Sequence, residues 1–375
     1  MAASSGAPAY QQITRVLRQE ILDGRYPPGA PFMTQRSLCE RFGVSSTTAV
    51  RVLNDLAAEG LVSRRRGRGT FIAAASERRP AGHGAGGPVI SCIIHNLHNS
   101  YVGSIVSGIE SVRADLGYRL QLTDSGESAR REEDALRQAA ASDIAGVLLY
   151  PVQGRAHAAA LVELQSRGIP VVMMDRYRPE VVSDAVLVDN DDLGYRITRE
   201  LVALGHERIA TLWSETDCTS VHERLGGHLR ALREDKLPIF AEFTALRGFV
   251  YLDGAGRRHL LRGLLEQPEP PTALLCSNSY VLAAAVEDLV ALGVELPGAI
   301  ELAAMDDAGP YTSLPVSALR AALPARELGR QAALLLHERV TADGPLRGTR
   351  RVVLPADILA PAPGQRPDRA SESMR

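Results

Sequence analysis

The arginines and glycines just after residue 63 have the composition of a phosphate-binding hairpin. The segment consists of Arg64, Arg65, Arg66, Gly67, Arg68, Gly69 and Thr70. The glycines supply the backbone freedom that a tight turn needs, and the apolar residues on either side predict two short strands, 61–65 and 70–73. A single arginine is usually a solvated surface charge, but four on one protruding hairpin favour contact with phosphates or a narrow minor groove of DNA.

A second group of polar residues stands where a helix is expected to begin. It consists of Ser45, Ser46, Thr47 and Thr48, and Arg51 follows within one turn. The free backbone N–H groups of a helix N-terminus bind phosphates, and the methyl group of a threonine can contact thymine. This group therefore predicts a DNA-reading surface.

The elements that must hold these groups form a small domain, expected over residues 1–75. Apolar residues recur at helical spacing from Tyr10 to Leu22. Thr34 is the expected N-cap of a second helix that ends at Gly43, and Ser45 begins a third helix that runs to about Glu59. Two helices joined by a tight turn make a helix-turn-helix, and the basic hairpin is its wing.

Charge and composition separate this domain from the rest of the chain. Residues 1–79 carry 12 arginines and six acidic residues, whereas the remainder carries 30 basic and 38 acidic residues. A basic piece on an acidic body indicates that one part meets a polyanion. Residues 76–88 are rich in Gly and Pro and read as a linker, and residues 361–375 read as a disordered tail.

Residues 89–360 alternate between apolar runs and amphipathic stretches. The expected strands are 89–94, 146–150, 170–174, 185–188, 208–212, 273–276 and 301–305. The expected helices are 102–116, 132–141, 156–167, 193–204, 222–234, 257–265 and 281–292. This alternation predicts a doubly wound α/β fold, whose ligands bind at the carboxyl ends of the strands.

The first domain resembles the winged helix-turn-helix of GntR-type transcription regulators over about 60 residues. The resemblance rests on the segments 21–29, 42–45, 56–62 and 67–72. It implies a DNA contact for Arg36, next to Gln35 and the cap Thr34. The family commonly has two arginines at the start of the third helix, which this chain lacks, and Arg51 is the candidate to replace them.

Residues from Val89 to about 360 resemble the sensor domain of LacI-type repressors. The resemblance rests on the segments 95–101, 108–110, 168–176, 188–190, 204–210, 223–227, 276–278 and 305–307. It implies two lobes crossed by three strands, with an effector between them. The first lobe is expected at 88–187 and 318–343, and the second at 189–305 with a final strand at 352–357.

The same resemblance places the effector contacts at Arg224, Asn278 and Asp306, and Arg176 stands in one of its motifs. Charged and amide groups of this kind suit hydroxyl-rich ligands, since each sugar hydroxyl both donates and accepts hydrogen bonds. The aromatic residues expected at strand ends could stack on a sugar face, and they are Tyr101, Tyr150 and Trp213. For Trp213, filling of the core is an equal alternative.

Other chemistries are weaker candidates. His95 and His98 could bind a metal but read better as polar loop residues. A GntR-type regulator with a pyridoxal-phosphate domain needs a Schiff-base lysine, and the single lysine, Lys236, stands in a charged helix end. Four scattered cysteines and the lack of a long apolar run fit a reducing cytoplasm rather than secretion or a membrane. A secreted sugar-binding protein would leave the basic domain unexplained.

We therefore expect a DNA-binding transcription regulator without a cofactor and without enzymatic activity. The pairing of domains is similar to that of arabinose-responsive repressors. It predicts a repressor that binds a palindromic operator as a homodimer and is released by a small carbohydrate-like effector. The effector, the operator, the sign of regulation and the choice between dimer and tetramer stay open.

Overall fold

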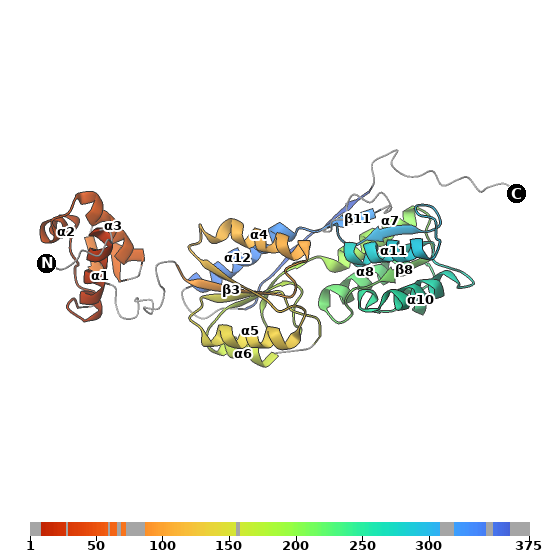
Figure 1. The fold of residues 1–375 in the computed structure, drawn as a ribbon, viewed down its shortest axis with the longest axis horizontal. Coiled ribbons are helices and arrows are strands. Elements are labelled where there is room, and N and C mark those ends of the chain that lie inside the picture. The colour runs from red at the N-terminus through yellow and green to blue at the C-terminus, as the bar shows by residue number, and fades with distance from the viewer. Residues whose placement is uncertain are drawn as a thin grey trace. The chain divides into compact units, whose positions relative to one another are not determined.

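The computed structural model describes residues 9–27, 29–58, 61–65, 69–72, 87–154, 158–307, 319–342 and 348–360. It separates into two compact units, Met1–Gly87 and Pro88–Arg375. Figure 1 shows the elements of both units. Three expected features lie outside the described residues: the turn of the basic hairpin at 66–68, most of the linker, and the tail at 361–375.

The first unit is a helix-turn-helix followed by a hairpin. Its elements are α1 (Ala9–Leu22), α2 (Gln35–Phe42), α3 (Ser46–Ala58), β1 (Val62–Arg65) and β2 (Gly69–Ile72). The side chain of Thr34 accepts a hydrogen bond from the backbone N–H of Ser37 and so begins α2, which ends where Gly43 adopts a left-handed conformation. The strands pair antiparallel. The predicted winged helix-turn-helix is confirmed.

The first lobe of the second unit is a six-stranded parallel sheet in the order β12, β7, β6, β5, β3, β4. The strands are β3 (Val89–Ile94), β4 (Arg119–Asp124), β5 (Gly146–Leu149), β6 (Val171–Asp175), β7 (Asp184–Val188) and β12 (Arg351–Leu354). Helices α4 (Ser100–Arg113) and α12 (Ala325–Thr341) cover one face, and α5 (Ala129–Ala141) and α6 (Ala158–Ser166) cover the other (Figure 1). Consecutive strand residues serve opposite faces: Cys92 packs in one cluster and Ile93 in the other.

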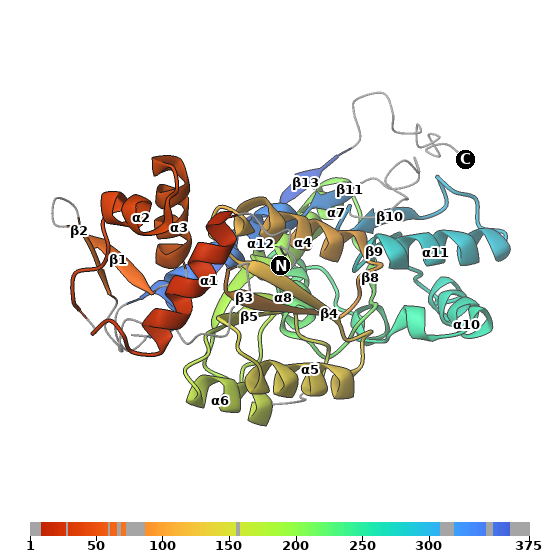
Figure 2. The same cartoon turned by 60° about the vertical axis from the view of Figure 1, so that its left-hand side comes forward.

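The second lobe is a five-stranded sheet in the order β13, β11, β10, β9, β8. The strands are β8 (Ile209–Leu212), β9 (Ala273–Cys276), β10 (Glu301–Ala304), β11 (Leu319–Ala322) and β13 (Asp357–Leu359), of which only β13 runs antiparallel to its neighbour. The helices are α7 (Asn190–Ala203), α8 (Thr219–Glu234), α9 (Ala241–Thr244), η1 (Phe249–Tyr251), α10 (Gly254–Leu265) and α11 (Ser279–Ala291). Figure 2 shows α10 and α11 on this lobe from a second direction. The predicted doubly wound α/β class is confirmed.

The expected division of the C-terminal strands between the lobes is wrong. Strand β11 was expected in the first lobe, but it pairs with β10 of the second. Strand β12 was expected in the second lobe, but it pairs with β7 of the first. The chain crosses between the lobes after β7, after β11 and after β12. Both strands lie at or near the edge of a sheet, and their apolar patterns do not say which sheet they join.

Two helix pairs approach so closely that only glycine fits at the contact. A Cβ atom on Gly108 of α4 would lie 1.9 Å from the carbonyl oxygen of Arg326 on α12, and one on Gly329 would lie 1.9 Å from that of Ile105. In the second lobe, Gly194 of α7 and Gly227 of α8 are equally crowded. These contacts fix the helices that follow the strand ends where a ligand is expected.

Replacing Gly108 by alanine should therefore destabilise the second unit by roughly 1–3 kcal/mol or more, because backbone atoms would have to move. Gly103→Ala is the matched control, since Gly103 lies on the same helix with nothing within 4 Å of the added atom. It should be neutral or stabilising by up to about 1 kcal/mol. Chemical unfolding followed by circular dichroism measures both, and equal effects would contradict the close packing.

Candidate DNA-binding surface and effector cleft

The start of α3 is held by its own polar residues. The Oγ atom of Ser45 accepts a hydrogen bond from the backbone N–H of Thr48 at 3.2 Å and lies 2.9 Å from Oγ1 of Thr48. Ser46 is exposed, and its carbonyl oxygen accepts a long hydrogen bond of 3.5 Å from Gln35 of α2. The helix start is thus preorganised by Ser45 and anchored to α2.

The two candidate arginines differ in their surroundings. Arg36 is highly exposed and forms an ion pair with Glu40 one turn along α2, at 3.0 Å. The guanidinium carbon of Arg51 lies 3.8 Å from the ring centre of Tyr10, and Nη2 donates to the hydroxyl of Tyr10 at 3.1 Å. This cation–π contact ties α3 to α1.

A buried carboxylate that the sequence analysis missed joins α1 to α2. Glu20 accepts hydrogen bonds from Arg41 at 2.6 Å and from the hydroxyl of Tyr26 at 3.0 Å. The hydrogen bond from Arg41 lowers the pKa of Glu20 despite burial. No local pattern marks this contact, because the partners lie 21 residues apart.

The hairpin is joined through its backbone to the segment between α1 and α2. The carbonyl oxygen of Thr70 accepts a hydrogen bond of 2.7 Å from the N–H of Phe32, and Arg65 pairs with Gly69 across the hairpin. Other predicted contacts cannot be located: Arg66, Gly67 and Arg68 lie outside the described residues, as do the side chains of Thr47 and Arg64. Their contacts with DNA stay predictions.

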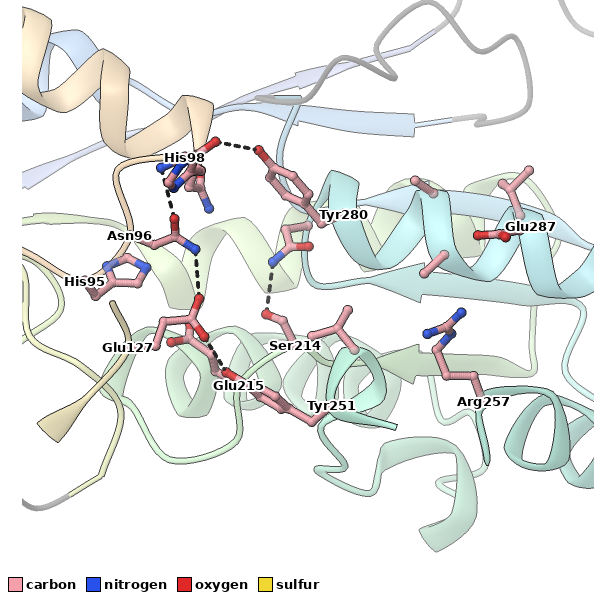
Figure 3. Close-up of a pocket in the computed structure, with 16 residues that line it drawn as sticks. His95, Asn96, His98, Glu127, Ser214, Glu215, Tyr251, Arg257, Tyr280 and Glu287 are labelled. Atoms are coloured by element: carbon pink, nitrogen blue, oxygen red, sulfur yellow. Dashed lines mark hydrogen bonds between the residues drawn. The ribbon is translucent and has the colours of Figure 1, made fainter. Parts of the chain in front are cut away.

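The candidate effector site lies where the carboxyl ends of both parallel sheets meet. Loops after β3 and β4 bring His95, Asn96 and Glu127, which face Glu215 and Tyr251 from the second lobe (Figure 3). These residues line a cavity of about 650 Å³, which continues along η1, α10 and α11. That volume is in the range typical of small-molecule sites.

Asp175, which the sequence analysis did not select, is buried in the first lobe and is not among the residues that line the cavity. It accepts hydrogen bonds from the hydroxyls of Tyr101 at 2.5 Å and Tyr150 at 2.7 Å, and all three side chains are buried. Burial, followed by the charge of Asp175, raises the pKa of both tyrosines well above 10. The structure thus brings the two predicted tyrosines together as hydrogen-bond donors.

The neighbouring Arg176 forms a bidentate ion pair with Glu215 of the second lobe. Its Nη1 and Nη2 atoms lie 2.8 and 3.0 Å from the two carboxylate oxygens. The guanidinium also lies 4.8 Å from the ring centre of Tyr150. Burial acts to raise the pKa of Glu215, but the charge of Arg176 and its hydrogen bonds outweigh burial and lower the pKa below its ordinary value.

The three residues implied by the family resemblance lie in the second lobe. Arg224 is buried and donates from Nε to Asn190 at 2.8 Å and from Nη1 to the carbonyl oxygen of Ser277 at 3.0 Å. Asn278 begins α11 as its N-cap. Asp306 accepts a hydrogen bond of 2.7 Å from the backbone N–H of Ser279, and burial raises the pKa of Asp306.

The expectation that Trp213 stacks on a ligand is wrong for this conformation. Its side chain is fully buried in the core, and its indole N–H donates to Thr211 at 2.9 Å. Thr211 in turn donates to the carbonyl oxygen of Phe243. The indole therefore packs in the core of the second lobe, which is the alternative that the sequence analysis gave for Trp213.

His95 lines the cleft with a nitrogen that has no hydrogen-bond partner. Its ring packs against Tyr150 at a centroid distance of 4.3 Å, and its Nδ1 atom is buried and unpartnered. Burial, followed by the charge of Arg176, lowers the pKa of His95 to about 4. Among the described residues no three His, Cys, Asp or Glu side chains gather as metal ligands, and His98 is exposed.

Comparisons with known proteins place both units in bacterial regulators. Residues 87–361 match the family of periplasmic binding proteins and sugar-binding domains of the LacI family, and residues 9–72 match bacterial regulatory proteins of the gntR family. The class is thus a DNA-binding transcription regulator with a ligand-sensing domain. The chain belongs to the first family, and it joins that domain to a GntR-type helix-turn-helix.

Individual relatives agree with this assignment. The arabinose metabolism transcriptional repressor of Geobacillus stearothermophilus is 26% identical over 338 residues, which cover 89% of this chain and 91% of the relative. A complex of the transcriptional regulator CelR with cellobiose has a TM-score of 0.64 at 22% identity, covering 88% of this chain and 99% of the other. A LacI-family regulator from Enterococcus faecium with bound ribose has a TM-score of 0.60 at 21% identity, covering 72% and 96%.

These relatives confirm the prediction of a regulator rather than an enzyme. In the described part of the chain, no helix is both long and apolar enough to cross a membrane.

The buried imidazole of His95 predicts a measurable acid sensitivity. An unfolded histidine binds its proton near pH 6.5, whereas His95 stays neutral to about pH 4 in the fold. The unfolded state thus holds one more proton in this window, and stability falls as the pH drops from 6.5 toward 4. His95→Gln should reduce the slope of the unfolding free energy between pH 6 and pH 5 by about 1 kcal/mol per pH unit.

The fluorescence of Trp213, the single tryptophan of the chain, reports the unfolding of this unit. His98→Gln, which replaces an exposed histidine of the same loop, is the control. An unchanged slope in His95→Gln would show that the imidazole is protonated in the folded protein.

Proposed function

We propose that this protein is a repressor that binds a palindromic operator as a homodimer and releases it when a small carbohydrate-like effector enters the cleft. The effector contacts are Tyr101, Tyr150, Arg176, Arg224, Asn278 and Asp306, with Asp175 and His95 added from the structure. The relatives include an arabinose repressor and complexes with ribose and cellobiose, which supports a carbohydrate. Among domains of this size, a dimer on two half-sites is the usual route to specificity.

The observation that carries the proposal is the composition of the cleft. The cavity is lined by the imidazole of His95, the amides of Asn96 and Asn278 and the carboxylates of Glu127 and Glu215, which come from both lobes at the carboxyl ends of the two sheets. The hydroxyls of Tyr101 and Tyr150 are hydrogen-bonded to Asp175 next to this lining. The guanidinium of Arg176 is paired with Glu215, whereas that of Arg224 donates to Asn190 and to the carbonyl oxygen of Ser277. A site with both hydrogen-bond donors and acceptors favours a polyhydroxyl ligand, because each sugar hydroxyl donates and accepts.

The physical route from the cleft to DNA runs through lobe closure. A ligand that contacts both lobes favours the conformation in which those contacts form together. Such a shift alters operator affinity only if it moves the dimer interface or the linker, and a Gly-rich linker transmits little. We therefore place the coupling at an interface between sensor units, with a typical coupling of about 1–3 kcal/mol.

The pyridoxal-phosphate alternative has no support in the structure. Lys236 is exposed and follows the end of α8, whereas a Schiff-base lysine is activated by burial or a neighbouring cation. No second function is proposed.

Arg224→Ala tests the cleft assignment. The variant should bind operator as the wild type does but should no longer release it when the releasing carbohydrate is added, with L-arabinose, D-ribose and cellobiose as first probes. The wild type should lose operator affinity some 5- to 150-fold. Fluorescence anisotropy of a labelled operator measures both quantities.

Arg233→Ala is the matched control, because it removes an exposed arginine from the same helix. It should respond to the carbohydrate as the wild type does. Release of the operator by Arg224→Ala at the wild-type ligand concentration would place the effector elsewhere.

A further inference from the structure

The ion pair between Arg176 and Glu215 joins the two lobes across the candidate cleft. Arg176 follows β6 of the first lobe and Glu215 follows β8 of the second. The side chain of Arg176 is 3% exposed and that of Glu215 is 21% exposed. Both carboxylate oxygens are used on the guanidinium, and Nε of Arg176 is buried without a partner. Glu215 therefore occupies both Nη donors of Arg176, and it lines the cavity, whereas Arg176 does not.

Three backbone N–H groups donate hydrogen bonds between the lobes beside this pair. The N–H of Gly154 donates to the carbonyl oxygen of Asp217 at 2.7 Å, and the N–H of Thr216 donates to Oε1 of Gln153 at 3.2 Å. On the other side, the N–H of Tyr177 donates to Oγ1 of Thr219 at 3.1 Å. Three amide hydrogens thus report whether the lobes are in contact.

We propose that Glu215 is a built-in competitor for Arg176, so that the pair is both a latch between the lobes and a determinant of which ligands can bind. A ligand that takes Arg176 has to supply two acceptor oxygens in place of this carboxylate. A ligand that leaves the pair intact is confined to the other residues that line the cavity, among them His95, Asn96 and Asn278. The ligand-selection part rests on the proposed function, whereas the latch stands by itself.

The latch follows from the cost of burying a charge. Removing one partner of a buried ion pair leaves the other charge uncompensated, and the cheapest response is to admit water. For Arg176 separation of the lobes admits water, since Glu215 of the second lobe covers both Nη atoms of its guanidinium. Removing both charges leaves no unpaired charge in the protein. The effects of the two single substitutions on lobe separation should therefore not add.

Hydrogen–deuterium exchange of the full-length protein, with no carbohydrate added, tests the latch directly. In Glu215→Gln, the amides of Gly154, Tyr177 and Thr216 should exchange at least about tenfold faster than in the wild type. Amides inside β5 and β9 should keep their wild-type rates, which shows that the variant is folded. The double variant R176Q/E215Q should exchange more slowly at the reporting amides than Glu215→Gln, because no unpaired charge remains.

Two further variants separate the latch from a general structural role. Asp184→Asn removes a carboxylate from another bidentate pair with Arg339, which lies within the first lobe, and it should leave the reporting amides unchanged. Glu215→Asp keeps the charge on a shorter side chain and should give an intermediate rate. Wild-type exchange in Glu215→Gln, or equal acceleration in Asp184→Asn, would overturn the proposal.

The outcome is independent of the effector. A carbohydrate screen that finds no ligand would remove the proposed function but not the latch. Wild-type exchange in Glu215→Gln would remove the latch and leave the cleft available as an effector site.

Discussion

The cost of burying charge in the cleft is the constraint on which the sensor depends. Asp175 and Arg176 are buried, so each must be paired, and Glu215 at the edge of the cavity supplies the partner of Arg176. The partners come from different strands and, for Glu215, from the other lobe. A pair of this kind couples lobe position to the occupancy of the site, because any ligand that changes the pairing also changes what holds the lobes together.

The surrounding packing makes this coupling possible. Helices α4 and α12, and α7 and α8, meet through glycines that leave no room for a methyl group. Such contacts hold each lobe as a rigid body, so that motion is confined to the three crossings and to the cleft contacts. In the other unit, the ion pair between Glu20 and Arg41 has a similar role, since it holds α1 against α2, the helix that precedes α3.

The sequence was informative where a residue's role is local. Thr34, Gly43 and the alternation of apolar runs predicted most helices and buried strands, because caps and periodicity are properties of adjacent residues. Strand β4 was missed, since its exposed edge position gives it a mixed pattern. The predicted lobes of β11 and β12 were wrong. Glu215 and Asp175 were not selected as site residues, because Arg176 lies 39 residues from Glu215 and Tyr101 lies 74 residues from Asp175. Trp213 shows that the position of an aromatic residue at a strand end does not decide between ligand contact and packing in the core.

The central claim is that the cleft binds a carbohydrate through the second-lobe residues that face it. Thermal unfolding of the purified protein against a panel of mono- and disaccharides measures this binding without any assumption about DNA. A ligand at 100 times its dissociation constant should stabilise the wild type by about 2.7 kcal/mol. The account predicts that at least one sugar of the panel stabilises the wild type in this way and that the same sugar does not raise the unfolding temperature of Arg224→Ala. Equal stabilisation of both proteins, or stabilisation only by charged compounds, would contradict it.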